Sequence, residues 1–124
     1  MANIGRVILV TRSVAGELVI EEKQIDLDSL DTMYQLIDCN LVACVESAKG
    51  NITAWVDDEG LLIDNPDLTD VTTVMEEGDK GCFGENIVLA GNILFTGGVG
   101  DEGETLPLAE HVTVDTIKQG ISVY

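Results

Sequence analysis

The sequence is poor in positive charge. Its 124 residues include six Lys and Arg residues against 23 Asp and Glu residues, which gives a formal net charge of −17. From residue 57 to residue 79 there are nine acidic residues and no Lys or Arg, and no Lys or Arg lies between Lys80 and Lys118. A negative field of this size repels nucleic acids and anionic membranes and attracts basic surfaces. We therefore expect no direct binding of nucleic acid and no membrane association.

Long apolar runs and paired cysteines are lacking as well. No run approaches the roughly 18 apolar residues that a transmembrane helix requires. The first twelve residues are too short and too rich in β-branched side chains for a signal peptide. The three cysteines, Cys39, Cys44 and Cys82, are odd in number and lack a CxxC spacing, which is typical of a reducing compartment. We expect a cytoplasmic protein.

The sequence also lacks the signatures of catalytic and metal sites. His111 is the one histidine, so a zinc site would need three thiolates from scattered positions. The acids after residue 57 do not follow the order of an EF-hand, which leaves a weak surface contact with Mg²⁺ or Ca²⁺ as the metal alternative. The Gly-rich residues 96–104 lack the Lys-Ser/Thr of a phosphate-binding loop, and Cys82 lies in an acidic loop that disfavours a thiolate. We expect no catalytic residue, resident metal or cofactor.

One helix and one hairpin stand out between residues 26 and 63. Leu30, Met33, Tyr34 and Ile37 recur at the spacing of one helical stripe, and Asp28 is the candidate N-cap, so we predict a helix over about 29–38. The runs 41–45 and 52–56 flank Lys49-Gly50-Asn51, and this pattern predicts an antiparallel hairpin. A turn at residues 57–60 would let residues 61–63 pair back on 52–56.

The remaining elements are predicted from shorter patterns. Residues 6–11 and 18–25 read as two strands, and the apolar run 87–95 is either one strand with a bulge at Gly91 or two short strands about Gly91-Asn92. Residues 97–104 read as a flexible acidic turn. A C-terminal helix is predicted over about 107–119, with Thr105 as its candidate cap and Gly120 at its end. The expected fold is one α+β domain over residues 1–124, mainly an antiparallel sheet with one central and one C-terminal helix.

The order of these segments resembles a family of small uncharacterised domains found mainly in bacteriophages and mobile elements of Gram-positive bacteria. The matching residues are 30–41, 57–62, Asn65-Pro66 and 100–104 followed by 106–112. The chain departs from the family pattern at Cys39-Asn40, where Gly-Gly is expected, and at 76–85, which looks like an insertion. The resemblance implies a phage accessory protein that acts in the host cytoplasm.

The first functional hypothesis is a non-enzymatic counter-defence protein. An acidic domain of this kind imitates the phosphate backbone of a nucleic acid, so it would bind and inhibit a host defence or nucleic-acid-binding protein through its basic surface. The candidate partner-binding residues are Asp57, Asp58, Glu59, Asp64, Asp67, Asp70, Glu76, Glu77 and Asp79.

Other functions stay open. One is a sponge that sequesters a small nucleotide immune signal at a subunit interface, and another is a structural or virion accessory role. An enzyme is the third, and it would need a metal or a nucleophile that the sequence does not reveal. The run 87–95 and the apolar C-terminal tail favour a homodimer or a higher homo-oligomer. The ligand site of the sponge alternative would use the cations of the N-terminal strands and two aromatic side chains, namely Arg6, Arg12, Lys23, Tyr34 and Trp55.

Overall fold

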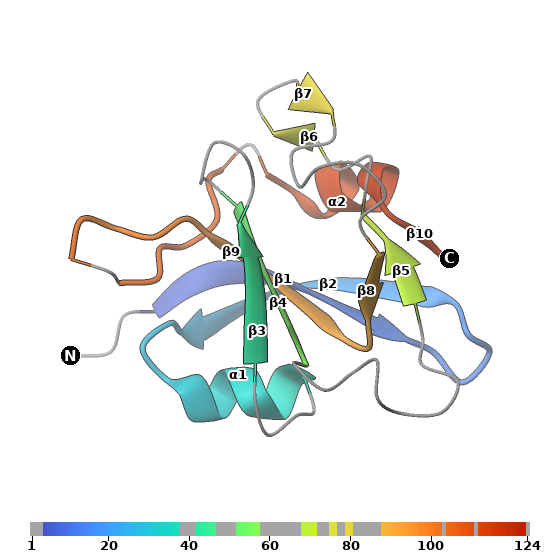
Figure 1. Cartoon of the computed structure of the whole chain (residues 1–124), viewed down its shortest axis with the longest axis horizontal. Coiled ribbons are helices and arrows are strands. Elements are labelled where there is room, and N and C mark those ends of the chain that lie inside the picture. Colours follow the sequence, from blue (N-terminus) through green and yellow to red (C-terminus); the bar gives the residue numbers. More distant parts are fainter. Residues whose placement is uncertain are drawn as a thin grey trace.

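The computed structural model describes residues 4–37, 42–46, 52–57, 68–71, 75–76, 79–80, 88–102, 104–110 and 112–123. Its largest unit is a five-stranded antiparallel sheet in the order β2-β1-β9-β4-β3 (Figure 1). A second sheet has the order β10-β5-β8, and β6 pairs with β7. The elements in chain order are β1 (Ile4–Arg12), β2 (Leu18–Asp26), α1 (Leu30–Ile37), β3 (Val42–Glu46), β4 (Ile52–Asp57), β5 (Leu68–Asp70), β6 (Met75–Glu76), β7 (Asp79–Lys80), β8 (Val88–Ala90), β9 (Ile93–Gly97), α2 (Val114–Gly120) and β10 (Ser122–Val123).

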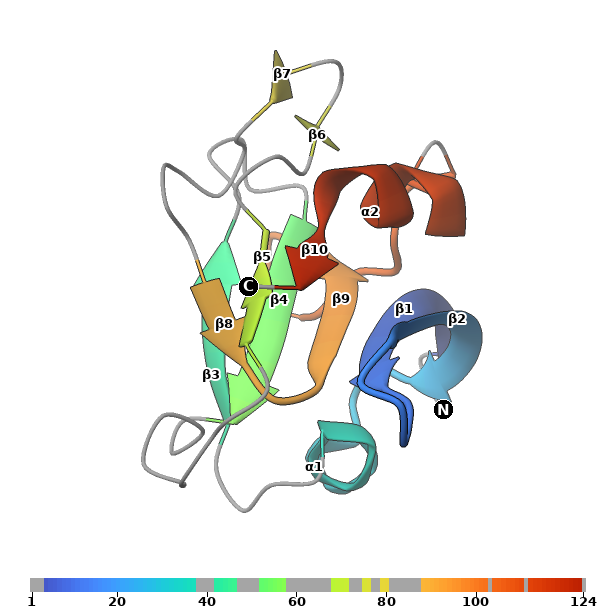
Figure 2. The ribbon, with the colours of Figure 1, turned by 90° about the vertical axis from the view of Figure 1, so that its right-hand side faces the viewer.

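Two hairpins and one inserted strand build the central sheet. The hairpin β1–β2 pairs along nine residues, and the hairpin β3–β4 confirms the predicted pairing of these two runs. Strand β9 lies between the hairpins and pairs with β1 on one side and β4 on the other (Figure 2). Its Phe95 is opposite both Ile8 and Ala54 and is fully buried. The predicted α+β fold with a mainly antiparallel sheet is therefore confirmed.

The sheet is covered on both faces. Side chains alternate between the two faces of a strand, so Val7 and Leu9 of β1 point to one face and Ile8 and Val10 to the other. The first face carries α1 and holds the α1-side cluster, whose buried members are Val7, Leu9, Ile25, Leu27, Met33, Ile37 and Leu94.

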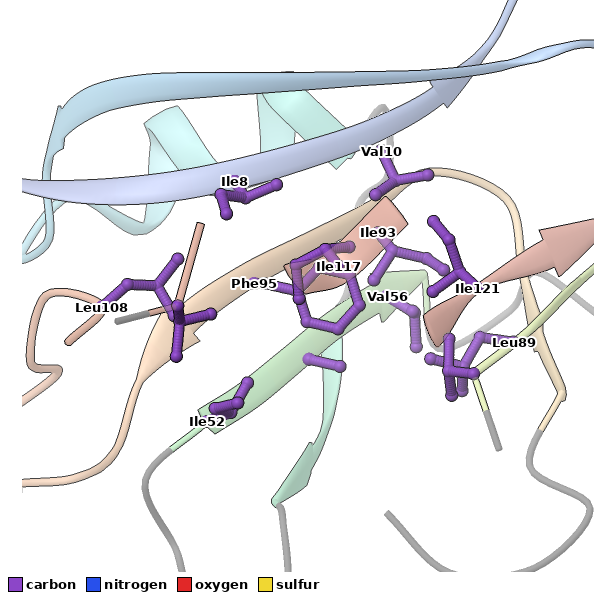
Figure 3. Close-up of a cluster of buried hydrophobic side chains, with 13 residues drawn as sticks. Ile8, Val10, Ile52, Val56, Leu89, Ile93, Phe95, Leu108, Ile117 and Ile121 are labelled. Carbon is purple, nitrogen blue, oxygen red and sulfur yellow. The ribbon is translucent and has the colours of Figure 1, made fainter. Parts of the chain in front are cut away.

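The opposite face carries α2 and the second sheet. The cluster between these layers, which we call the α2-side cluster, contains the largest group of buried side chains in the described part of the chain (Figure 3). Its members are Ile8, Val10, Ile52, Ala54, Val56, Val71, Leu89, Ile93, Phe95, Leu108, Val112, Ile117 and Ile121.

The apolar run 87–95 forms two strands, not one bulged strand. The chain changes direction at Gly91, whose φ of 77° lies in the left-handed region that favours glycine. As a result β8 belongs to the second sheet and β9 to the central sheet.

The predicted C-terminal helix is too long at its N-terminal end. The described residues 107–110, 112 and 113 are not helical. The Leu108 N–H donates to the Arg6 carbonyl of β1, and the Val112 N–H donates to the Ala109 carbonyl. Helix α2 begins at Val114, and Thr113, not Thr105, is its N-cap. The Thr113 side chain accepts from the Thr116 backbone N–H and the Thr116 hydroxyl accepts from the Thr113 N–H, which makes a capping box. The predicted end at Gly120 is confirmed.

Helix α1 occupies the predicted range, but its start differs in detail. The Ser29 hydroxyl, not Asp28, accepts from the Thr32 backbone N–H, while the Asp28 N–H donates to the Asp26 carboxylate.

Residues 47–51 and 61–63 lie outside the described residues. The edge of β4 that the sequence assigned to residues 61–63 is occupied by β9. Within the described segments, neither helix has the length and apolar character needed to cross a membrane.

Candidate interaction surface

Most of the predicted acidic partner site lies outside the described residues. Asp58, Glu59, Asp64, Asp67 and Glu77 belong to this group, and for Glu76 and Asp79 only the strand placement is described. Asp57 ends β4, opposite Val42, and Asp70 ends β5, opposite Val88 and Ser122. Both are half-buried, and they belong to different sheets. The prediction that these acids form one face therefore stays a prediction.

Arg6 is directed into the protein. Its guanidinium donates to the carbonyls of Ala109 and Val112 at 2.5 and 2.6 Å and to the Glu22 carboxylate at 2.8 Å. Its side chain is 19% exposed. These part-buried bonds hold the segment before α2 against β1, because hydrogen bonds from an ionised donor are stronger than those between neutral groups.

Arg12 connects β1 to strand β5 of the second sheet. Its guanidinium donates to the Leu68 carbonyl of β5 and, at 3.3 Å, to the Thr69 hydroxyl. It also donates to the Gly16 carbonyl at 3.2 Å, across the turn between β1 and β2. Both arginines thus connect strand β1 of the central sheet to the segments packed on its α2 side, mainly through backbone carbonyls.

The structure does not bring the predicted cationic ligand site together. Arg6 and Arg12 share a face of β1 but stand six residues apart, a separation of about 20 Å along a strand. Lys23 is opposite Val7, which belongs to the α1-side cluster, so its side chain lies on the other face of the sheet. It lies 3.5 Å from the Glu21 carboxylate. Within one described chain, the three cations cannot contact one small ligand.

The two predicted aromatic ligand residues lie on the α1 side of the sheet. Trp55 packs against the α1-side cluster, and its indole N–H donates to the Thr96 hydroxyl at 2.9 Å. Tyr34 lies on α1 and is partly exposed. Since Arg6 and Arg12 lie on the opposite face, the five residues named for a ligand site are divided between the two faces.

A second acidic feature follows β9. We call residues 98–102 and 104–106 the acidic hairpin, which projects beyond the end of the central sheet (Figure 1). The Leu106 N–H donates to the Gly98 carbonyl at 3.0 Å, the Gly100 N–H donates to the Glu104 carbonyl at 2.8 Å, and a β-bridge joins Val99 and Thr105. The Glu104 carboxylate folds over the turn and accepts from the Glu102 N–H at 3.0 Å.

The acidic turn expected within residues 97–104 is present in the described residues, and its flexibility stays a prediction. The turn is closed by backbone hydrogen bonds, and it presents the exposed carboxylates of Asp101, Glu102 and Glu104. Sequence reasoning missed this arrangement, although Val99 and Thr105 flank a Gly-Asp-Glu-Gly turn in a pattern that favours a hairpin.

The described surface is dominated by carboxylates because the arginines point inward. Lys23 and Lys118 are the basic side chains that the described segments leave on the outside, and the described residues include no group of three His, Cys, Asp or Glu side chains arranged to hold a metal ion. The exposed acids of the described residues are Glu17, Glu21, Glu22, Asp28, Asp31, Glu46, Asp101, Glu102, Glu104, Glu110 and Asp115.

Comparison with known proteins gives one match. A family model described as a domain of unknown function, DUF3846, matches residues 6–121. The chain belongs to the DUF3846 family. No curated protein and no solved structure matches it. The expected resemblance to an uncharacterised domain family is thus confirmed, and the expected phage origin stays a prediction. The part of the chain that matches the DUF3846 model includes both arginines that bind the backbone and the acidic hairpin.

Proposed function

We propose that this DUF3846 protein is a non-enzymatic, phage-encoded accessory protein that binds and inhibits a basic host protein through its acidic surface. The host target of this proposal is a defence or nucleic-acid-binding protein, whose phosphate-binding surface is positively charged. The observation that supports the proposal is the division of charge between the interior and the surface. Arg6 and Arg12 are directed at backbone carbonyls, while eleven described acids are exposed.

Because two of the cations are directed into the protein and the acids are exposed, the described surface is more negative than a surface with the same composition and exposed arginines. Among the eleven exposed acids, Glu22 forms an ion pair with Arg6 and Glu21 forms one with Lys23, so the other nine have no ion pair among the described residues. The remaining field steers a basic partner toward the protein and raises the association rate, and salt weakens it. The acidic hairpin projects beyond the end of the central sheet, so its exposed carboxylates are accessible to a partner (Figure 1).

The experiment that tests the proposal is purification of the protein from cells that carry phage-defence systems, followed by native mass spectrometry. We expect a complex with a basic host protein at low ionic strength that dissociates at high ionic strength. A small molecule bound to the protein would contradict the proposal and favour the sponge alternative. A complex that is indifferent to salt would contradict its electrostatic basis.

A pair of matched variants locates the binding surface. The hairpin variant combines Asp101→Asn, Glu102→Gln and Glu104→Gln. The control variant combines Glu17→Gln, Glu21→Gln and Asp28→Asn, which removes the same three charges from exposed positions outside the hairpin. We expect the hairpin variant to weaken the complex more than the control variant. Equal effects would show that total charge matters and the hairpin does not.

A further inference from the structure

The two edges of the central sheet differ in their protection. An edge strand presents unpaired N–H and C=O groups, and proteins usually guard such an edge with charged side chains. Strand β2 is guarded, because Glu21, Glu22, Lys23 and Gln24 follow one another along it. Strand β3, with the sequence Val-Ala-Cys-Val-Glu, carries a single charge at its end.

In the described part of the chain, strand β3 has a neighbouring strand on one side only. It pairs with β4 along all five residues, and no other strand in the described part of the chain pairs with it. It lies at the rim of the sheet, on the far side from the β1–β2 hairpin (Figure 2). Its residues are half-buried or exposed, with Cys44 and Glu46 exposed. Every second residue of such a strand directs its N–H and C=O groups outward.

We propose that β3 is a docking edge to which an extended segment of the basic partner adds as a further strand of the central sheet. This inference rests on the proposed function for the basic character of the partner, and it adds the mode of binding. Main-chain hydrogen bonds supply affinity in this mode, and the side chains that alternate between the two faces supply selectivity.

Charge determines which kind of strand fits this edge. A second copy of the chain would also carry a net charge of −17, so it would be repelled by the first copy. Glu46 lies exposed at one end of β3, and Asp57, on the inner neighbour β4, is paired with Val42 at the other end. A segment that alternates apolar residues with Lys or Arg meets the apolar middle of β3 and the Glu46 carboxylate.

The test uses a synthetic peptide of alternating Val and Lys residues. The matched probe is the same peptide with alternate backbone nitrogens methylated, which keeps its charge and side chains but removes N–H donors. Binding is measured by titration, and amide exchange is followed residue by residue in the DUF3846 protein. We expect the unmodified peptide to bind about tenfold more tightly than the methylated one and to protect amides of residues 42–46.

Two protein variants with the same change in charge complete the test. Cys44→Lys places a guarding charge on β3, and Gln24→Lys places one on β2, both at exposed positions. We expect Cys44→Lys to weaken peptide binding and to abolish the protection of β3 amides, while Gln24→Lys retains both.

The remaining outcomes of the peptide titration and the exchange measurement contradict the edge pairing, the proposed function or the choice of β3. Equal binding of the two peptides would overturn edge pairing and leave the acidic proposal standing. If neither peptide binds at low ionic strength, both proposals fail. Protection of β2 in place of β3 would overturn the assignment of the edge. Concentration-dependent protection of β3 in the free protein, with a dimeric mass, would show that a second copy occupies this edge instead of a basic partner.

Discussion

Two threonines face each other on neighbouring strands of the central sheet, and their hydroxyls have different surroundings. Thr53 of β4 is paired with Thr96 of β9, and both are buried. The Thr96 hydroxyl accepts from the Trp55 indole and donates to the Gly97 carbonyl. The Thr53 hydroxyl has no hydrogen-bond partner among the residues that the structure describes. A buried hydroxyl without a partner costs free energy, whereas a satisfied one contributes to stability.

This contrast predicts that substitution by Val changes the free energy of unfolding differently at the two threonines. Thr53→Val removes an unsatisfied hydroxyl at nearly constant volume and should leave the free energy of unfolding unchanged or raise it by about 1 kcal/mol. Thr96→Val leaves the Trp55 N–H without its acceptor and should lower that free energy by about 1–2 kcal/mol. Urea unfolding of the two variants measures both. Equal destabilisation would show that packing of the hydroxyl, not its hydrogen bond, decides the effect.

Arg6 is the second residue whose role can be tested alone. Arg6→Met keeps the length of the side chain but leaves the carbonyls of Ala109 and Val112 without their charged donor. We expect a loss of about 2 kcal/mol in the free energy of unfolding. Lys23→Met removes a charge from a partly exposed position, and it should change this free energy by less than about 0.5 kcal/mol. Similar losses for the two variants would refute the structural role of Arg6.

At the scale of elements, the sequence predicted those with strong periodicity and missed those that depend on distant residues. The stripe of Met33 and Ile37 defined α1, and the hairpin β3–β4 followed from its flanking runs. The start of α2 was not predictable from local pattern, because the bonds of Arg6 to the carbonyls of Ala109 and Val112 hold these residues outside the helix.

The candidate site was predicted less well than the fold. The acidic character of the chain followed from composition, but the inward orientation of Arg6 and Arg12 depends on contacts with residues 68–69 and 109–112. No sequence window contains both partners of these bonds. The two faces of β1 also separate Lys23 from the arginines, and that separation depends on the register of the β1–β2 pair.

Helix α2 has seven residues and depends on its cap. A helix this short is not stable alone, so its capping box and the burial of Ile117 have to maintain it. Thr113→Ala removes the side-chain acceptor and should lower the free energy of unfolding by about 1 kcal/mol. Thr113→Ser retains the hydroxyl and is expected to lose much less. If both variants lose the same amount, the methyl group of Thr113 and not its cap is responsible.

At the scale of the whole molecule, the net charge opposes the compact state. The described residues contain two ion pairs, Arg6–Glu22 and Lys23–Glu21, against many exposed carboxylates. Carboxylates that repel one another are closer together in the folded chain than in the unfolded chain, and salt screens this repulsion.

We therefore expect the melting temperature to rise as sodium chloride is added from low to physiological ionic strength. The control variant with Glu17→Gln, Glu21→Gln and Asp28→Asn should melt at a higher temperature than the parent in low salt and respond less to added salt. A melting temperature that falls with salt would mean that attractive ion pairs outweigh repulsion. Thermal unfolding followed by circular dichroism measures this response.

The position of β9 has a consequence for synthesis on the ribosome. The two hairpins of the central sheet are made early, but β9, the strand between them, is made near the end of the chain. Until residues 93–97 emerge, β1 and β4 have no common neighbour, and each keeps an unpaired edge. Contacts between residues so distant in sequence slow folding. The nascent chain therefore carries two incomplete hairpins from the synthesis of β4, which ends at Asp57, until β9 emerges, and the sheet closes when this later strand enters its middle.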